Sequence, residues 1–177
     1  MPEAVLCEPK SDAELTQVLV DLCGAGGPVL LTRLDPARLG RLPDDLVDQL
    51  DLDPVSCTAI LGGCLPERPG LVGIAAAGTS DRRVAAEVAR TLEFSGIDHD
   101  MFIDIGVAGL WRLEAHLDQL RAVDVVIAVA GMDAAMVSVL GGLVSAPLTE
   151  WRVAVGRCGQ PGTSGRLFWR FSRGEGR

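Results

Sequence analysis

The sequence predicts an α/β fold built on a doubly wound parallel sheet, because apolar strands and helices alternate from Leu71 onward. The first expected strand, 71–77, is a continuous apolar run, which is typical of a parallel strand covered on both faces. Further strands are expected at 100–105 and 125–130. Repeated strand–helix–strand units form one sheet through right-handed crossovers. We therefore expect adjacent parallel strands whose carboxyl ends face a common cleft.

The helices between these strands are indicated by apolar spacing and by glycine. The first expected helix, 81–96, repeats valine, alanine and leucine on one face and ends at Gly96. Two more helices are expected at 109–122 and 133–146. These elements define a core domain over 71–148.

Residues 1–66 are expected to form a smaller α/β lead-in, followed by a linker at 67–70. Its main helix should begin after Ser11, because Glu14 three residues on completes a capping box. The other expected elements are strands at 28–33 and 55–63 and two short helical pieces within 35–54, separated by Gly40 and Pro43.

Composition and charge narrow the class of protein. The 177 residues are 48% hydrophobic and 23% charged, as in a folded globular chain, and the net charge of −8 argues against a nucleic-acid partner. The first residues show no signal peptide, and no apolar run is long enough for a membrane span, so we expect a cytoplasmic protein without a membrane partner. Five cysteines without a CxxC pair predict reduced thiols and no metal site.

Glycine-bearing segments follow each of the three expected strands, with the sequences AGTSD, DIGVAGL and AGMDAA. Ligands of open α/β sheets bind at this edge, where free backbone N–H groups at helix starts favour an anion. Thr79 and Ser80 would add hydroxyl donors for a phosphate, and Asp81 would accept from a sugar hydroxyl. The alternative is that Ser80 or Asp81 only caps the following helix. The pattern predicts a small nucleotide site and names no chemistry.

The same three segments, continued by VVIAVAGMDAAMVSVLGGLVSAPL, resemble the LarB family, pyridinium-3,5-biscarboxylic acid mononucleotide synthases. More distantly they resemble PurE, the aminoimidazole ribonucleotide carboxylase or mutase of purine (IMP) biosynthesis. The resemblance implies a three-layer flavodoxin-like sheet, assembly into a homo-oligomer, and a nucleotide substrate together with CO2. For a LarB-like protein it implies carboxylation of nicotinic acid adenine dinucleotide and hydrolysis of its phosphoanhydride, in the synthesis of a nickel-pincer cofactor.

The resemblance also implies which residues form the site. Asp133 is the expected catalytic residue, and magnesium is the one cofactor left open. The expected nucleotide-binding residues come from all three loops: Gly78, Thr79, Ser80, Asp81, Gly106, Val107, Ala108, Gly109, Gly131, Met132 and Ala135.

Several positions depart from the family pattern. Trp111 stands where a histidine is common, and is expected to be a core or interface aromatic or to stack on a ring; Val137 replaces a usual proline. After Leu148 the family's glycine loop, long helix and cysteine are missing, and Cys158 does not match the cysteine motif. Residues 149–177 instead hold six Arg against two Glu, with six glycines. This composition is typical of an alternative or frameshifted end, or of a basic tail for an acidic partner.

Two classes of function follow. The first is an enzyme of the LarB or PurE type, in which a cysteine thiolate would activate the ring for CO2 addition. The second is a non-catalytic nucleotide-binding isoform that keeps the sheet. Because the cysteine and its helix are missing, we expect this chain to lack ring-carboxylation activity.

Overall fold

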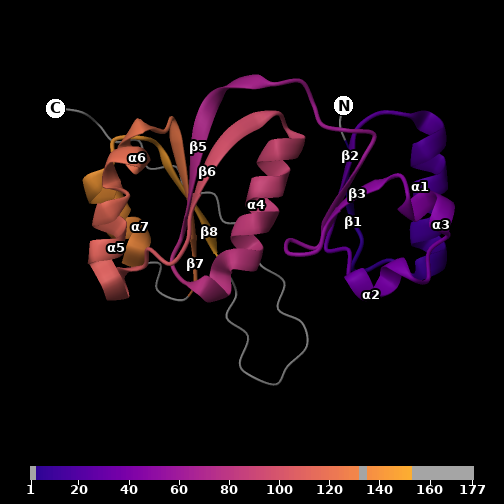
Figure 1. Cartoon of the computed structure of the whole chain (residues 1–177), viewed down its shortest axis with the longest axis horizontal. Coiled ribbons are helices and arrows are strands. Elements are labelled where there is room, and N and C mark those ends of the chain that lie inside the picture. The colour runs from indigo at the N-terminus through magenta and orange to yellow at the C-terminus, as the bar shows by residue number, and fades with distance from the viewer. Residues whose placement is uncertain (1–2, 132–134, 153–177) are drawn as a thin grey trace. The chain divides into compact units, whose positions relative to one another are not determined.

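The computed structural model describes residues 3–131 and 135–152. Its internal contacts divide the chain into two compact units (Figure 1). The first, here called the N-terminal unit, comprises residues 1–68 and 86–97. The second, the loop-bearing unit, comprises residues 69–85 and 98–177. Each unit has its own four-stranded sheet.

The sheet of the N-terminal unit is mixed and has the order β1-β2-β4-β3. β1 (Glu3–Leu6) runs parallel to β2 (Val29–Thr32), whereas β4 (Thr58–Leu61) is antiparallel to both β2 and β3 (Leu50–Asp53). β2 and β4 confirm two expected strands. β1 was not expected, and β3 occupies a stretch that was expected to be helical, because pairing along β4 outweighs the local helical pattern.

The helices of this unit follow the sequence signals closely. α1 (Asp12–Ala25) begins with the expected capping box, in which the Ser11 hydroxyl accepts from the Glu14 N–H and the Glu14 carboxylate accepts from the Ser11 N–H. The two short helical pieces are α2 (Pro36–Leu39) and α3 (Asp44–Val47). The apolar sides of these helices and of the sheet form one core that includes Leu15, Leu19, Leu31, Leu46 and Ala59.

A buried arginine holds the start of α1 to α2. Arg38 is 9% exposed, and its guanidinium donates to Asp12 Oδ1 and to the Cys7 and Lys10 carbonyls, each at 2.8 Å. Arg41 donates to the other oxygen of Asp12 at 2.6 Å. Hydrogen bonds from Arg41 and Arg38 lower the pKa of the Asp12 carboxyl.

The sheet of the loop-bearing unit has the order β6-β5-β7-β8 and confirms the predicted parallel α/β arrangement. β5 (Arg68–Ala76) is parallel to β7 (Val125–Ala130), and β7 is parallel to β8 (Leu148–Arg152). β6 (Ile97–Phe102) lies along the other side of β5. Hydrogen bonds from Arg68 to Gly96 at one end and from Ile105 to Ala76 at the other give β6 the same direction as β5.

Helices follow β5, β6 and β7. α4 (Arg82–Phe94) comes after β5, and α5 (Leu110–Ala115) and α6 (Leu117–Ala122) come after β6. α7 (Ala135–Leu143) comes after β7. The core of the loop-bearing unit joins α5, α6 and α7 to the sheet through Leu113, Leu120, Val126, Met136 and Leu140.

Three expectations are corrected in this unit. The linker expected at 67–70 is mostly strand, because β5 already begins at Arg68. The single helix expected at 109–122 is divided at His116, whose φ of −109° and ψ of 5° are not helical. The strand that the fold requires after α7 is present and begins at Leu148, three residues before the stretch in which it was expected.

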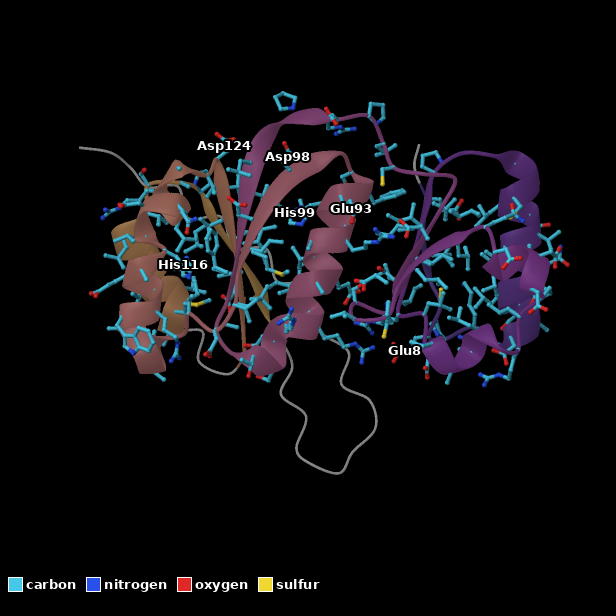
Figure 2. All side chains as sticks on the ribbon, in the orientation of Figure 1. Glu8, Glu93, Asp98, His99, His116 and Asp124 are labelled. Atoms are coloured by element: carbon cyan, nitrogen blue, oxygen red, sulfur yellow. The ribbon has the colours of Figure 1, made fainter. Side chains whose placement is uncertain are left out.

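No helix of the described residues is long and apolar enough to cross a membrane. Within residues 3–131 and 135–152, His, Cys, Asp and Glu side chains form no group of three that could hold a metal ion. Figure 2 shows the two histidines, His99 on β6 and His116 at the α5–α6 boundary. The acidic residues Asp98 and Asp124 lie at the amino-terminal ends of β6 and β7, away from the edge where the glycine loops follow the strands.

Candidate functional site

The loops that follow β5 and β6 are joined by backbone hydrogen bonds at the carboxyl edge of the parallel sheet. The Gly106 N–H donates to the Ala77 carbonyl at 2.9 Å, directly beyond the bond from Ile105 to Ala76 at 3.1 Å. The Ala77 N–H donates in turn to the Val129 carbonyl of β7 at 2.9 Å. The ends of three strands therefore meet, as the sequence predicts.

The first loop closes on itself through Asp81. Gly78 is followed by a single 3-10 turn, Thr79–Asp81, and the Gly78 N–H donates to Asp81 Oδ2 at 3.0 Å. Asp81 is 8% exposed, whereas Thr79 and Ser80 are exposed. The Asp81 carboxylate thus has the capping role that the sequence left open, and the two hydroxyls remain accessible. A bond from Asp81 to a sugar hydroxyl stays a prediction.

The second loop requires glycine at its first position. A Cβ atom on Gly106 would lie 2.5 Å from the Ala77 carbonyl oxygen, which is too close for any side chain. The loop continues as a 3-10 turn, Val107–Gly109, in which Val107 and Ala108 are exposed and Gly109 is buried. The glycine at 106 therefore brings the second loop against the first.

Arg112 is a residue of this site that sequence reasoning missed. A Cβ atom on Gly109 would lie 2.7 Å from the Arg112 Cζ atom, so the guanidinium lies directly against the second loop. Arg112 Nε donates to the Asp104 carbonyl, and Nη2 lies 3.5 Å from Asp104 Oδ1. Asp104 has a φ of 65°, in the left-handed region that non-glycine residues rarely adopt. The signal in the sequence was an arginine three positions after the glycine that ends the loop.

The side chain of Arg112 combines a positive charge with partial exposure. Its side chain is 31% exposed, and Asp104, its acidic partner, is 42% exposed. The long separation between the two charged groups leaves guanidinium N–H groups for a further acceptor. Arg112 can therefore contribute positive charge beside the loops.

Exposed apolar side chains surround the start of α5. Val107, Leu110 and Trp111 are 40%, 45% and 69% exposed. The Arg112 guanidinium carbon lies 5.3 Å from the centroid of the Trp111 ring. This exposure rules out a core role for Trp111 within the chain and leaves an interface role or stacking on a ring.

The third loop is described only at its two ends. Gly131 follows β7 and is half-buried, and Ala135 is the exposed first residue of α7. Met132 and Asp133, the latter expected to be catalytic, lie outside the described residues. Contacts between α7 and the Val107–Gly109 turn place the helix of the third loop beside the second loop. Val137, which departs from the family pattern, packs against the core of this unit.

These features define an α/β protein whose glycine loops gather at the carboxyl edge of a parallel sheet, with one arginine beside them. No family model matches the sequence. The chain is similar to an uncharacterized protein of Methanocaldococcus jannaschii, MJ0165, with 31% identity over 158 residues. The similarity covers 84% of this chain and 61% of that protein, so the chain spans less than two thirds of the length of the relative. That name states no activity.

Proposed function

We propose that this chain is a LarB-like nucleotide-binding protein, with a flavodoxin-like, PurE-like core, that acts on nicotinic acid adenine dinucleotide. The observation that carries the proposal is the backbone bond between Gly106 and Ala77 at 2.9 Å, which brings two glycine loops to one edge of a parallel sheet. This edge is where nucleotides bind in open α/β sheets.

The two loops and Arg112 supply complementary groups for a phosphate. The exposed Thr79 and Ser80 carry hydroxyl donors in the 3-10 turn that leads into α4. The Arg112 guanidinium beside Gly109 adds a positive charge. Asp81 supports the first loop from within, because Oδ2 accepts from the Gly78 N–H.

The chemistry assigned to Asp133 is hydrolysis of the phosphoanhydride. The carboxylate would take a proton from a water that attacks phosphorus, and the bond to the leaving AMP would break. Ring carboxylation would further need a nucleophile that adds to the pyridinium, and Cys158 does not match the family's cysteine motif. We therefore propose that ring carboxylation is lost or very slow in this chain.

The composition after Leu148 favours a second candidate, a nucleotide-binding protein without catalysis. Residues 149–177 carry six Arg and two Glu where the family has a glycine loop and a cysteine helix. Such a protein would keep the phosphate-binding groups of the first two loops and form no product.

The exposed apolar residues at the start of α5 support assembly of the chain into a homo-oligomer. Trp111, at 69% exposure, offers a large apolar area that a second subunit would bury. Light scattering after size exclusion tests this proposal. Trp111→Glu should reduce the mass of the assembly. Equal masses for the wild-type chain and the variant would contradict an interface at Trp111.

The decisive experiment incubates the full chain with nicotinic acid adenine dinucleotide and bicarbonate, with and without magnesium, and identifies products by mass spectrometry. AMP without a carboxylated pyridinium supports the hydrolytic proposal, and nucleotide binding without product supports the second candidate. Carboxylated product would contradict the proposed loss of that step.

Binding is tested by calorimetry with Ser80→Glu and with Ser145→Glu, a matched change at an exposed residue beyond the far end of α7. Ser80→Glu should weaken binding of a mononucleotide about tenfold or more, because a carboxylate would face the phosphate. Equal affinities in the two variants would leave Ser80 only a capping role.

A further inference from the structure

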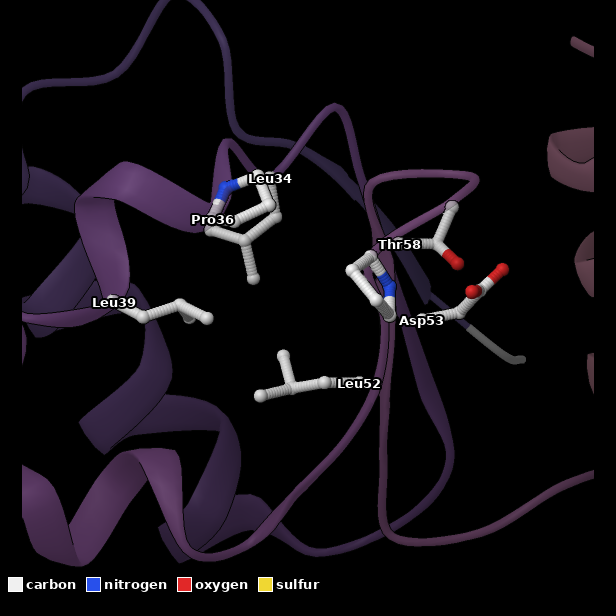
Figure 3. Close-up of a pocket in the computed structure, with 7 residues that line it drawn as sticks. Leu34, Pro36, Leu39, Leu52, Asp53 and Thr58 are labelled. Atoms are coloured by element: carbon white, nitrogen blue, oxygen red, sulfur yellow. The ribbon is translucent and has the colours of Figure 1, made fainter. Parts of the chain in front are cut away.

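An apolar pocket of about 150 Å³ lies in the N-terminal unit, which does not contain the three glycine loops (Figure 3). It is formed by α2 and the turn that joins β3 to β4. The leucine side chains face one another across the pocket, while the oxygens of Asp53 and Thr58 are directed away from them. The lining residues are Leu34, Pro36, Leu39, Leu52, Asp53, Pro54 and Thr58.

The polar atoms in the wall already have partners within the turn. The Asp53 carboxylate accepts from the Val55 N–H at 3.1 Å and from the Ser56 hydroxyl at 2.6 Å. The Thr58 hydroxyl lies 2.7 Å from the Ser56 hydroxyl. A polar group that entered the pocket would therefore lose water without gaining a hydrogen bond, and the pocket favours an apolar group.

The size of the pocket suits one side chain. An engineered cavity of about 150 Å³ binds benzene, so a pocket of about 150 Å³ accommodates the end of a leucine, methionine or phenylalanine. Pro36 and Pro54 at its mouth are exposed, and the neighbouring Val55 is 51% exposed. These residues extend the apolar surface beyond the pocket, as expected for an extended ligand.

The unit that contains this pocket is strongly negative. The N-terminal unit has fourteen acidic residues against six basic ones, a net charge of −8. Residues 35–53 contain six Asp and two Arg; both arginines bond to Asp12, and Asp51 pairs with Arg90. Three of these aspartates form no ion pair within the described part of the chain: Asp44 and Asp45 of α3, and Asp48 directly after it.

We propose that this pocket docks a basic peptide segment of a partner protein, which inserts one apolar side chain between Leu39 and Leu52. Arginine or lysine residues on either side of that side chain meet Asp44, Asp45 and Asp48. The ligand must therefore carry one apolar side chain for the pocket and basic side chains for the aspartates. A peptide can present both kinds of side chain a few residues apart.

The test titrates the full chain with a capped nine-residue peptide that has a central leucine and two arginines on each side. Backbone amide shifts by NMR should identify Leu34, Leu39, Leu52 and Thr58 as the site. A peptide with a central serine should bind about tenfold more weakly. Replacing its arginines with glutamates should abolish binding, and raising the salt concentration should weaken binding of the original peptide.

Variants of the protein then separate the pocket from general charge. Leu39→Phe should fill the pocket and reduce affinity, with Leu39→Met as the volume-conserving control and thermal unfolding as the check on folding. Removing three charges by Asp44→Asn, Asp45→Asn and Asp48→Asn should reduce affinity more than Asp118→Asn, Asp124→Asn and Asp98→Asn in the other unit. The proposal is overturned if the leucine peptide shifts no pocket amide, if the serine peptide binds equally, or if Leu39→Phe leaves affinity unchanged.

Discussion

The two units of this chain differ in charge and in how distant segments are held together. The N-terminal unit carries fourteen acidic and six basic residues, whereas the described residues of the loop-bearing unit, 69–85, 98–131 and 135–152, carry eight acidic and five basic ones. The pocket of the N-terminal unit therefore belongs to a more negative unit than the glycine loops do. The negative total charge counts against nucleic acid, and it opposes an anion less in the loop-bearing unit than in the N-terminal unit.

The means of holding distant segments differ as well. In the N-terminal unit, the buried Arg38 joins α2 to Asp12 and to two carbonyls through its side chain. In the loop-bearing unit, main chain meets main chain at Gly106 and Ala77. The first arrangement should depend on one charged side chain, and the second on the absence of a side chain.

The largest effect is expected from Arg38→Ala. The change leaves the Cys7 and Lys10 carbonyls and Asp12 without the guanidinium, and should lower the free energy of unfolding by about 2–4 kcal/mol. Arg41→Ala is the control, because the Arg41 side chain is 55% exposed. Urea unfolding followed by circular dichroism measures both. Equal losses in the two variants would show that burial of Arg38 is not important.

Gly106→Ala tests the close backbone approach in the other unit. The added methyl group meets the Ala77 oxygen, and the required shift should cost about 1–3 kcal/mol. Hydrogen exchange should show lost protection in β5 and β6 near the loops. Gly142→Ala is the matched control, since a Cβ atom there contacts nothing within 4 Å, and it should be neutral or slightly stabilising. Similar stabilities for the two variants would contradict the tight approach.

Arg112→Gln tests the positive charge beside the second loop. If a phosphate binds there, affinity for a mononucleotide should fall about tenfold, and Arg112→Lys should recover part of it. Arg121→Gln, on α6 and exposed, should leave affinity unchanged. Calorimetry provides the measurement. No change in Arg112→Gln would remove Arg112 from the proposed site.

The smallest effect is expected for the contribution of Asp12 to the loss of stability in acid. Because hydrogen bonds from Arg41 and Arg38 lower the pKa of Asp12 from its usual value of 3.8, the carboxylate stabilises the fold above that value. This contribution is lost as the pH falls from about 3.8 through the lower folded pKa. Asp12→Asn should therefore reduce the difference between urea midpoints at pH 7 and pH 3, compared with Asp118→Asn. An unchanged difference would refute this role for Asp12.

Local hydrogen bonding and apolar spacing determined much of this protein from sequence alone. The capping box of Ser11 and Glu14 involves residues three apart, so it is visible in the sequence and confirmed in α1. Continuous apolar runs likewise predicted β5 and β7. The glycine loops lie at one edge of the sheet because the strands are parallel, and the alternation of strands and helices implied this parallel direction.

Long-range pairing decided the remainder. β3 was mistaken for helix because its pairing partner, β4, contributes hydrogen bonds that no local pattern reports. The bond from Gly106 to Ala77 and the contact of Arg38 with Cys7 join residues 29 and 31 positions apart. The capping role of Asp81 also needed coordinates, because a carboxylate at a helix start can equally bind a ligand. Local propensity acts within a few residues, whereas these contacts form only when tertiary packing brings distant main chain and side chains together.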